Sequence, residues 1–184
     1  MDNLLIRPAR ENDCDDILAI YEPYVANTSI TFEVDIPRPE DFLGRMRKIK
    51  ARYPYLVAST GGQIVGFAYA AELMERAAYQ WNAALSVYLR DDFSGRGLGT
   101  ALYRALIEIL KLQKFQSVYG VVTLPNPASV KLHERFGFRP VGLSAQAGYK
   151  CGAGHYGMVC ETHIGGHRRA LAPPRPDADV AARV

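Results

Sequence analysis

Hydrophobic residues recur along this chain with helical spacing in some segments and as short apolar runs in others. The clearest helical segment follows residue 97, where an apolar side chain returns every three or four positions. These positions are Leu98, Ala101, Leu102, Ala105, Leu106 and Ile109. The spacing predicts an amphipathic helix with one buried face, and it is the strongest helical signal in the sequence.

Two weaker helical patterns lie nearer the N-terminus. Asn12 and Asp13 can cap a helix, and its apolar side carries Ile17, Ile20, Tyr21 and Tyr24. Pro23 is expected to kink or shorten this helix. Residues 41–52 are rich in Arg and Lys and keep one apolar edge, which predicts a largely solvated second helix.

Strand-like runs fill most of the remaining chain. Residues 55–59 and 63–71 flank a Gly-Gly pair and predict a β-hairpin. Other strands are expected at residues 4–7, 81–89, 118–124, 138–147 and 155–163. Between the strands at 118–124 and 138–147, Asn126 and Pro127 can begin a helix that Gly137 ends. This order predicts an α/β (α+β) fold in which a mixed sheet packs against helices.

Length and composition are those of one domain with a tail. The chain has 184 residues, of which 48% are hydrophobic. We expect a single domain over residues 1–165, since this length suffices for one core and a ligand cleft. Residues 166–184 are rich in Pro, Ala and Arg and predict a flexible C-terminal tail, because they carry too little apolar surface to order themselves alone.

Charge and cysteine usage narrow the classes of partner. The net charge is only +3 and the basic residues are scattered, which argues against a nucleic-acid partner. No apolar stretch is long enough to span a membrane, so no membrane partner is expected. The three cysteines show no Cys-x-x-Cys spacing, and the N-terminal segment lacks the apolar core of a secretory signal. We therefore expect reduced thiols in a cytoplasmic protein.

Three glycines at alternate positions join the strand at 81–89 to the strongest helix. Gly95, Gly97 and Gly99 can adopt positive φ and carry no Cβ, so backbone N–H groups can converge on a phosphate at the helix N-terminus. The spacing differs from Gly-x-Gly-x-x-Gly, and no Gly-Lys-Ser or Gly-Lys-Thr follows. A phosphorylated small molecule is therefore predicted here, and a simple tight turn is the alternative.

Residues 94–99, Ser-Gly-Arg-Gly-Leu-Gly, resemble the pyrophosphate loop of the GCN5-related N-acetyltransferase (GNAT) superfamily, Gln/Arg-x-x-Gly-x-Gly/Ala. Ser94 stands where Gln or Arg is usual, so the side-chain contact to the phosphates is either lost or made by Arg96. The resemblance to phosphinothricin N-acetyltransferases is closer. It extends over residues 6–9, 52–54, 66–69, 87–89, 124–126, 129–134, 148–150 and 172–176.

This resemblance implies the GNAT fold, with a mixed central sheet of about seven strands and about four helices. It also implies that acetyl-CoA is the acetyl donor and that the acceptor is the primary amine of a small amino-acid-like molecule. Phosphinothricin, methionine sulfone and methionine sulfoximine are the first examples. Members of the closer family are commonly homodimers, so a homodimer is expected, and no metal site is predicted.

The resemblance assigns roles to residues around the loop. For acetyl-CoA it implies backbone contacts from the strand, pyrophosphate contacts from the loop and a helix face along the pantetheine arm. The residues are Val87, Tyr88, Leu89, Gly95, Arg96, Gly97, Leu98, Gly99, Thr100, Asn126 and Ser129. His133 lies seven residues after Asn126 on the same helix face and would protonate the departing thiolate. The alternatives are that Asn126 serves only as an N-cap and that His133 is a surface residue.

Acceptor contacts are also implied. Arg76 and Tyr79 match acceptor-side positions of the family, and a guanidinium suits a carboxylate or phosphinate. Phe32 is a further candidate for substrate binding. Arg76 can equally be a solvated loop charge. A crowded acceptor pocket formed by Phe32, Tyr79 and Trp81 would argue against peptide acceptors.

One position departs from the family. Relatives carry a Glu on the fourth strand, thought to act as general base through water, and Ala84 stands there in this chain. Glu72, Glu75 or His155 could serve instead, or the amine could arrive neutral. Alternatively, the acceptor has changed or turnover is lost. The competing hypothesis is therefore an acyl-CoA-binding module with weak or no catalysis.

Overall fold

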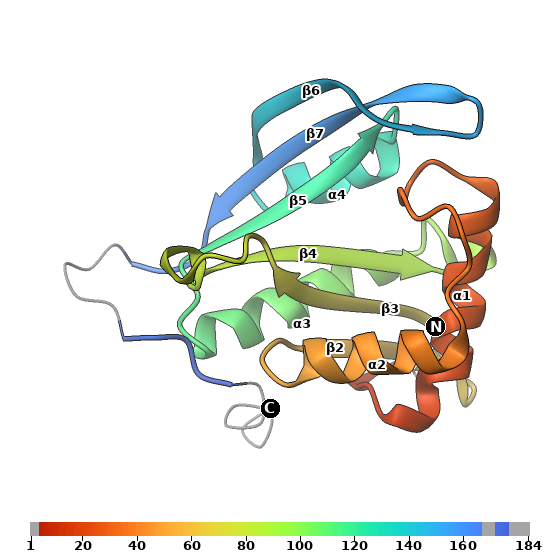
Figure 1. Ribbon diagram of the computed structural model, residues 1–184. Coiled ribbons are helices and arrows are strands. Elements are labelled where there is room, and N and C mark those ends of the chain that lie inside the picture. Colours follow the sequence, from red (N-terminus) through yellow and green to blue (C-terminus); the bar gives the residue numbers. More distant parts are fainter. Residues whose placement is uncertain (1–3, 167–171, 177–184) are drawn as a thin grey trace.

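A single mixed sheet organises the protein in this computed structural model, which describes residues 4–166 and 172–176 (Figure 1). The strand order is β1-β2-β3-β4-β5-β7-β6, and β4 and β5 form the one parallel pair among the neighbours in this sheet. The strands are β1 (Leu5–Pro8), β2 (Tyr55–Thr60), β3 (Gln63–Glu72), β4 (Asn82–Leu89), β5 (Ser117–Leu124), β6 (Arg139–Lys150) and β7 (Ala153–His163).

Two pairs of helices cover opposite faces of this sheet (Figure 1). They are α1 (Cys14–Asn27) and α2 (Pro39–Lys50) on one face, and α3 (Leu98–Leu112) and α4 (Pro127–Arg135) on the other. Each face has its own hydrophobic core. Seven strands and four α-helices in the described residues agree with the fold that the resemblance implies.

Helix α3 confirms the strongest pattern of the sequence. Leu98, Leu102, Leu106 and Leu110 are at most 1% exposed and pack against the strands beneath. Burying each such side chain stabilises the fold by about 1.5–3 kcal/mol before entropy is counted. The stripe therefore holds α3, and the glycine turn before it, rigidly against the sheet.

Of the two effects predicted for Pro23, a kink or a shorter first helix, the shortening is wrong. Helix α1 continues for four residues beyond Pro23 and ends at Asn27. The proline is exposed, so water can reach the carbonyl that loses its hydrogen bond, while Tyr21 and Val25 on the opposite side stay buried. Packing of the apolar face outweighs the local propensity.

The last two strands are longer than the sequence indicates. Their hairpin turn contains Cys151 and Gly152, both with positive φ, at 53° and 75°. Such a turn matches the right-handed twist of the strands, so β6 and β7 continue to Lys150 and from Ala153. Apolar periodicity gave no sign of this extension because residues 148–154 carry few apolar side chains.

Part of the predicted tail contacts the domain. Residues 172–176 are described, and the remaining tail residues, 167–171 and 177–184, lie outside the described part of the chain. The Trp81 indole N–H donates to the Ala172 carbonyl at 2.9 Å. The buried Gln113 side chain donates to the Arg175 carbonyl at 3.0 Å. This segment thus ties the start of β4 to the end of α3.

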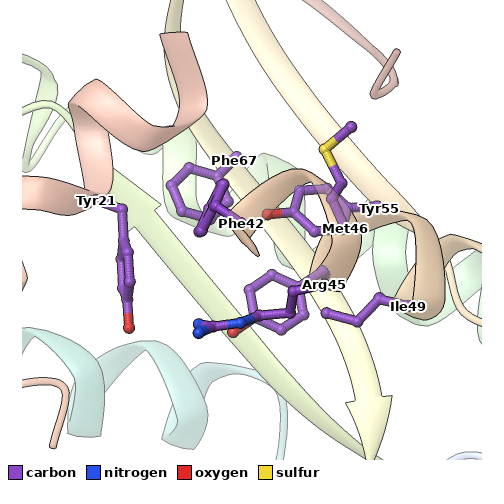
Figure 2. Close-up of a pocket in the computed structure, with 8 residues that line it drawn as sticks. Tyr21, Phe42, Arg45, Met46, Ile49, Tyr55 and Phe67 are labelled. Atoms are coloured by element: carbon purple, nitrogen blue, oxygen red, sulfur yellow. The ribbon is translucent and has the colours of Figure 1, made fainter. Parts of the chain in front are cut away.

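Aromatic rings fill the space between α1, α2 and the sheet (Figure 2). The lining residues are Tyr21, Phe42, Arg45, Met46, Ile49, Tyr55, Phe67 and Tyr69. The cavity among them has room for about one water molecule. In Figure 2 the Arg45 guanidinium points toward Tyr21, and it forms an ion pair with Glu33. This face is therefore a packed core and not a ligand cleft.

Candidate active site

The sheet opens where β4 and β5 stop pairing. The two strands are in register only from Asn82 opposite Ser117 to Ala84 opposite Tyr119. Beyond that point β4 stays paired with β3, and β5 stays paired with β7. The separated ends form a cleft lined by Ile30, Leu85, Ser86, Val87, Tyr88, Tyr103, Val121, Val122, Thr123, Asn126, Ser129 and His133.

Backbone groups of β4 face this cleft. The Arg90 N–H donates to the carbonyl of Val65 on the neighbouring strand β3, so by alternation Val87 and Leu89 direct their backbone groups away from β3. The Tyr24 hydroxyl donates to the Leu89 carbonyl at 2.6 Å and accepts from the Leu89 N–H at 3.3 Å. Among the described residues no side chain engages Val87 in this way. The Val87 N–H is therefore the open donor on β4.

The glycine turn has the predicted backbone at two of its three glycines. Gly95 and Gly97 have φ of +74° and +82°, and a Cβ at either would meet no atom within 4 Å. Gly99 instead lies inside the first turn of α3, close to Leu89 and Leu132, so the expectation of positive φ there is wrong. The first intrahelical bond runs from the Ala101 N–H to the Gly97 carbonyl. The backbone N–H groups of residues 95–100, which come before this first bond, are thus available to bind an anion.

Cationic side chains flank the turn. The Arg96 guanidinium lies 5.2 Å from the Phe93 ring centroid, and Arg90 lies over the same ring. The Thr100 hydroxyl accepts from Arg135 of α4 at 3.3 Å. Arg90 forms an ion pair with Asp92 at 2.7 Å, whereas among the described residues no ion pair is found for Arg96. Arg96 is therefore the cation that can approach a phosphate.

Helix α4 supplies the other wall. Asn126 caps it, because its Oδ1 accepts from the Ser129 N–H at 3.1 Å. Asn126, Ser129 and His133 all line the cleft, as their helical spacing predicts. Asn126 therefore both caps α4 and lines the cleft.

His133 is buried and held at both ring nitrogens. It is 4% exposed, so its assignment to the helix surface is excluded. Its Nδ1 lies 2.8 Å from the Ser129 carbonyl, and its Nε2 lies 3.0 Å from the Tyr103 hydroxyl. Burial lowers the pKa of His133 below its ordinary value, partly offset by the bond to the Ser129 carbonyl. The imidazole is accordingly neutral near pH 7.

Tyr103 is a site residue that the sequence did not reveal. It belongs to the apolar face of α3 and is 1% exposed, so its spacing indicates a core position. A buried tyrosine hydroxyl nevertheless needs a hydrogen-bond partner, and that need was the available signal. The second missed residue is Gly120 of β5, where a Cβ would lie 2.1 Å from His133 Nε2.

The predicted acceptor residues do not come together in this chain. Phe32 packs on the β6–β7 hairpin, since a Cβ on Gly148 would lie 2.6 Å from its ring. Arg76 and Tyr79 lie before the start of β4. Leu89 is at the other end of this eight-residue strand, about 20 Å away. Trp81 also lies before the start of β4, so the expectation of one crowded pocket formed with Phe32 is wrong.

None of the three candidate bases lines the cleft. Glu72 and Glu75 are exposed near the far end of β4. His155 places Nε2 2.9 Å from the Lys150 carbonyl in the β6–β7 hairpin. Among the described residues that line the cleft, the titratable side chains are Tyr88, Tyr103 and His133.

Two further properties concern residues 4–166 and 172–176. No helix in these ranges is long and apolar enough to cross a membrane. The same ranges contain no group of three or more His, Cys, Asp or Glu side chains placed to hold a metal ion. Cys14 and Cys160 are buried free thiols, and Cys151 is an exposed one.

Comparison with known families and curated proteins gives consistent matches. The family model described as an acetyltransferase (GNAT) domain matches residues 6–159. A phosphinothricin N-acetyltransferase of Streptomyces viridochromogenes is 34% identical over 174 residues, covering 93% of this chain and 91% of that protein. An L-methionine sulfoximine/L-methionine sulfone acetyltransferase of Pseudomonas aeruginosa is 36% identical over 152 residues, covering 80% and 87%.

A solved structure shows the same architecture. The crystal structure of a GNAT superfamily phosphinothricin acetyltransferase from Sinorhizobium meliloti, in complex with AcCoA, aligns with a TM-score of 0.88. The sequences are 30% identical, and the alignment covers 95% of this chain and 96% of that one.

Proposed function

Because this chain belongs to the GNAT acetyltransferase family, we propose that it transfers the acetyl group of acetyl-CoA to the primary amine of a small amino-acid-like acceptor. The observation that carries this proposal is the separation of β4 from β5 beside the left-handed glycine turn. The strand offers a free backbone donor, and the turn offers several more at a helix N-terminus.

Acetyl-CoA fits the groups that this cleft presents. Its pyrophosphate would be held by the N–H groups of residues 95–100, with Arg96 beside them. Its thioester carbonyl would accept from the Val87 N–H, and Asn126 and Ser129 would lie along the pantetheine arm. Acetyl-CoA supplies an activated acyl group with a thiolate leaving group. The chain must orient that group, receive the proton of the amine and return one to sulfur.

The acceptor class follows from the relatives. Their names give phosphinothricin, L-methionine sulfoximine and L-methionine sulfone as substrates. Each carries an α-amine, a carboxylate and a tetrahedral polar phosphorus or sulfur centre. Phe32 is our candidate for the apolar contact to such an acceptor. Arg76 and Tyr79 stay predicted acceptor residues, although the structure does not bring them beside Phe32.

The test is a thiol-release assay with purified protein and acetyl-CoA. The acceptor panel holds the three amino acids named above, an unsubstituted amino acid and a peptide with a free N-terminus. We expect thiol release with at least one of the three analogues and N-acetyl product by mass spectrometry. No release above background with any amine would refute the proposal, and release with the peptide alone would refute the acceptor class.

The alternative function, an acyl-CoA-binding module with little catalysis, is favoured by one observation. Ala84 is half-buried beside the opening of the cleft and offers no proton acceptor. Calorimetric binding of acetyl-CoA without turnover would support this alternative. Ala84→Glu tests whether a carboxylate there limits the rate. Ala71→Glu, opposite Ala84 on β3, is the matched control because it adds the same charge one strand away.

A homodimer and a cytoplasmic location also stay predictions. Sedimentation velocity of the purified protein, with and without acetyl-CoA, measures the oligomeric state directly. A single species near the 20.4 kDa of one chain would contradict the homodimer.

A further inference from the structure

The cleft contains no carboxylate among its described lining residues, yet acyl transfer must move a proton from the amine to sulfur. Tyr103 and His133 are the titratable pair that line the cleft and contact each other. Their rings meet edge to face, with centroids 5.3 Å apart and planes at 88°. The Tyr103 hydroxyl lies 3.0 Å from Nε2 and 3.5 Å from the Leu85 carbonyl of β4.

The partners of His133 fix where its proton sits. The shorter contact of Nδ1 is to the Ser129 carbonyl at 2.8 Å, and a carbonyl can only accept, so we assign the hydrogen to Nδ1; the Ser129 hydroxyl lies farther away, at 3.4 Å. In a neutral imidazole Nε2 is then a bare acceptor. The Tyr103 hydroxyl is the donor that meets it. In this resting state His133 has no proton at Nε2 to give to a thiolate, whereas Tyr103 has one beside the cleft.

We propose that Tyr103 is a catalytic residue that relays protons between the reactants and His133 in both directions. The inference rests on the acetyl transfer proposed above. As the amine bonds to the acyl carbon, its proton passes to the Tyr103 oxygen while the phenol proton moves to Nε2. As the C–S bond breaks and its electron pair goes to sulfur, Nε2 returns its proton to Tyr103 and Tyr103 protonates sulfur. One proton is transferred from nitrogen to sulfur, and no other reactant is consumed.

The surroundings of the pair are uncharged. Besides Tyr103 on α3, the imidazole faces Gly120 on β5, Phe138 and the Cys160 thiol of β7. The thiol donates to the Gly120 carbonyl at 3.5 Å, and burial raises its pKa, so it stays protonated. Burial also raises the pKa of Tyr103 and lowers that of His133. The resting pair is therefore phenol and neutral imidazole, ready to accept the first proton.

The decisive variant is Tyr103→Phe, which keeps the ring and removes the hydroxyl. We expect kcat to fall about 100-fold, in the range of general acid–base catalysis, with the KM for acetyl-CoA changed less than about twofold. Tyr53→Phe is the matched control. Tyr53 is 5% exposed, and its hydroxyl has no partner among the described residues. This variant should keep wild-type kcat.

Two further measurements distinguish a relay from a structural hydrogen bond. The pH profile of kcat should have an acidic limb from protonation of His133, and this limb should vanish in Tyr103→Phe. Adding His133→Gln to Tyr103→Phe should cost little more, because the two residues act as a unit. Nitrogen NMR of the wild-type protein should show the Nδ1–H tautomer for His133.

Each outcome decides one question. Wild-type kcat in Tyr103→Phe, or an Nε2–H tautomer, would overturn the relay while leaving acetyl transfer intact. Absence of turnover in the wild-type protein with every acceptor would refute the proposed function and the relay with it. A loss of kcat with an unchanged acidic limb would assign Tyr103 a structural role only.

Discussion

Adding a single methyl group at Gly120 should displace His133. Its Cβ would lie 2.1 Å from Nε2 and 2.5 Å from Cδ2 of the imidazole. Carbon and nitrogen atoms in contact normally stay about 3.5 Å apart, so Gly120→Ala brings them about 1.4 Å too close. Cys160 Sγ, at 3.0 Å from the same Cβ, blocks relief by a shift of the strand. The imidazole must rotate and release Tyr103.

The cost follows from these contacts. Overpacking of a core costs about 1–3 kcal/mol, and loss of the bond to the Tyr103 hydroxyl costs about 1 kcal/mol more. We therefore expect the free energy of unfolding to fall by about 2–4 kcal/mol, which lowers Tm by about 5–15 °C for a chain of this length. Turnover should fall with it, because the aligned pair is lost.

Thermal and urea unfolding, followed by circular dichroism, measure this change, and the thiol assay measures turnover. Gly142→Ala is the matched control, since its Cβ would meet no atom within 4 Å and it also lies in a strand. A second check uses His133→Ala, which removes the imidazole that the new methyl group would meet. In that background Gly120→Ala should cost much less. An equal cost in both backgrounds, or stability and turnover like those of Gly142→Ala, would refute this account of the packing.

Three further outcomes follow from the structure. Gly97→Ala should raise the KM for acetyl-CoA about tenfold and cost about 1–2 kcal/mol of backbone strain, whereas Gly62→Ala, at φ +80° in the hairpin turn, should show only the strain; equal KM values would contradict a phosphate role. Asp13→Asn should lower the free energy of unfolding by about 1–3 kcal/mol at pH 7, because the Asp13 carboxylate accepts two hydrogen bonds from the Arg7 guanidinium. Those bonds lower the pKa of Asp13. The difference in unfolding free energy between wild type and variant should therefore be complete above pH 3.9, roughly the pKa of an unfolded aspartate, and should disappear as the pH falls through the lower native pKa. A stability difference that persists at acid pH in urea titrations would contradict this. Deleting residues 172–184 removes the acceptor of the Trp81 indole, so stability should fall by about 1–2 kcal/mol and the emission of this single tryptophan should shift to the red; unchanged emission would contradict that contact.

Local chemistry explains which features could be predicted from the sequence. Gly95 and Gly97 adopt positive φ because the chain reverses between a strand and a helix, and that geometry needs glycine whatever lies around it. Asn126 caps α4 because its side chain reaches an N–H three residues on. Both properties depend on neighbours in sequence, so residue type and spacing suffice to predict them.

Contacts between distant segments could not be predicted in this way. The site at His133 needs Tyr103 from α3 and Gly120 from β5, and nothing in the spacing of one element reveals the others. The acceptor residues fail for the same reason. Phe32 and Arg76 are both predicted acceptor residues, but Phe32 packs on the β6–β7 hairpin whereas Arg76 precedes β4. Strand order and direction are properties of the whole sheet.

The two walls of the opening between β4 and β5 differ in the kind of group that they present, main-chain groups on one wall and side chains on the other. The hydrogen-bond donors that β4 and the glycine turn offer at the opening include main-chain N–H groups, which survive most substitutions. The other wall consists of side chains on α4 and of the loop that carries Phe32, and there each substitution changes the chemistry. Side chains of this second wall can therefore be substituted without changing the main-chain donors of the first. Ala84, half-buried at the boundary between the two walls, adds neither a charge nor a hydrogen-bonding side chain there.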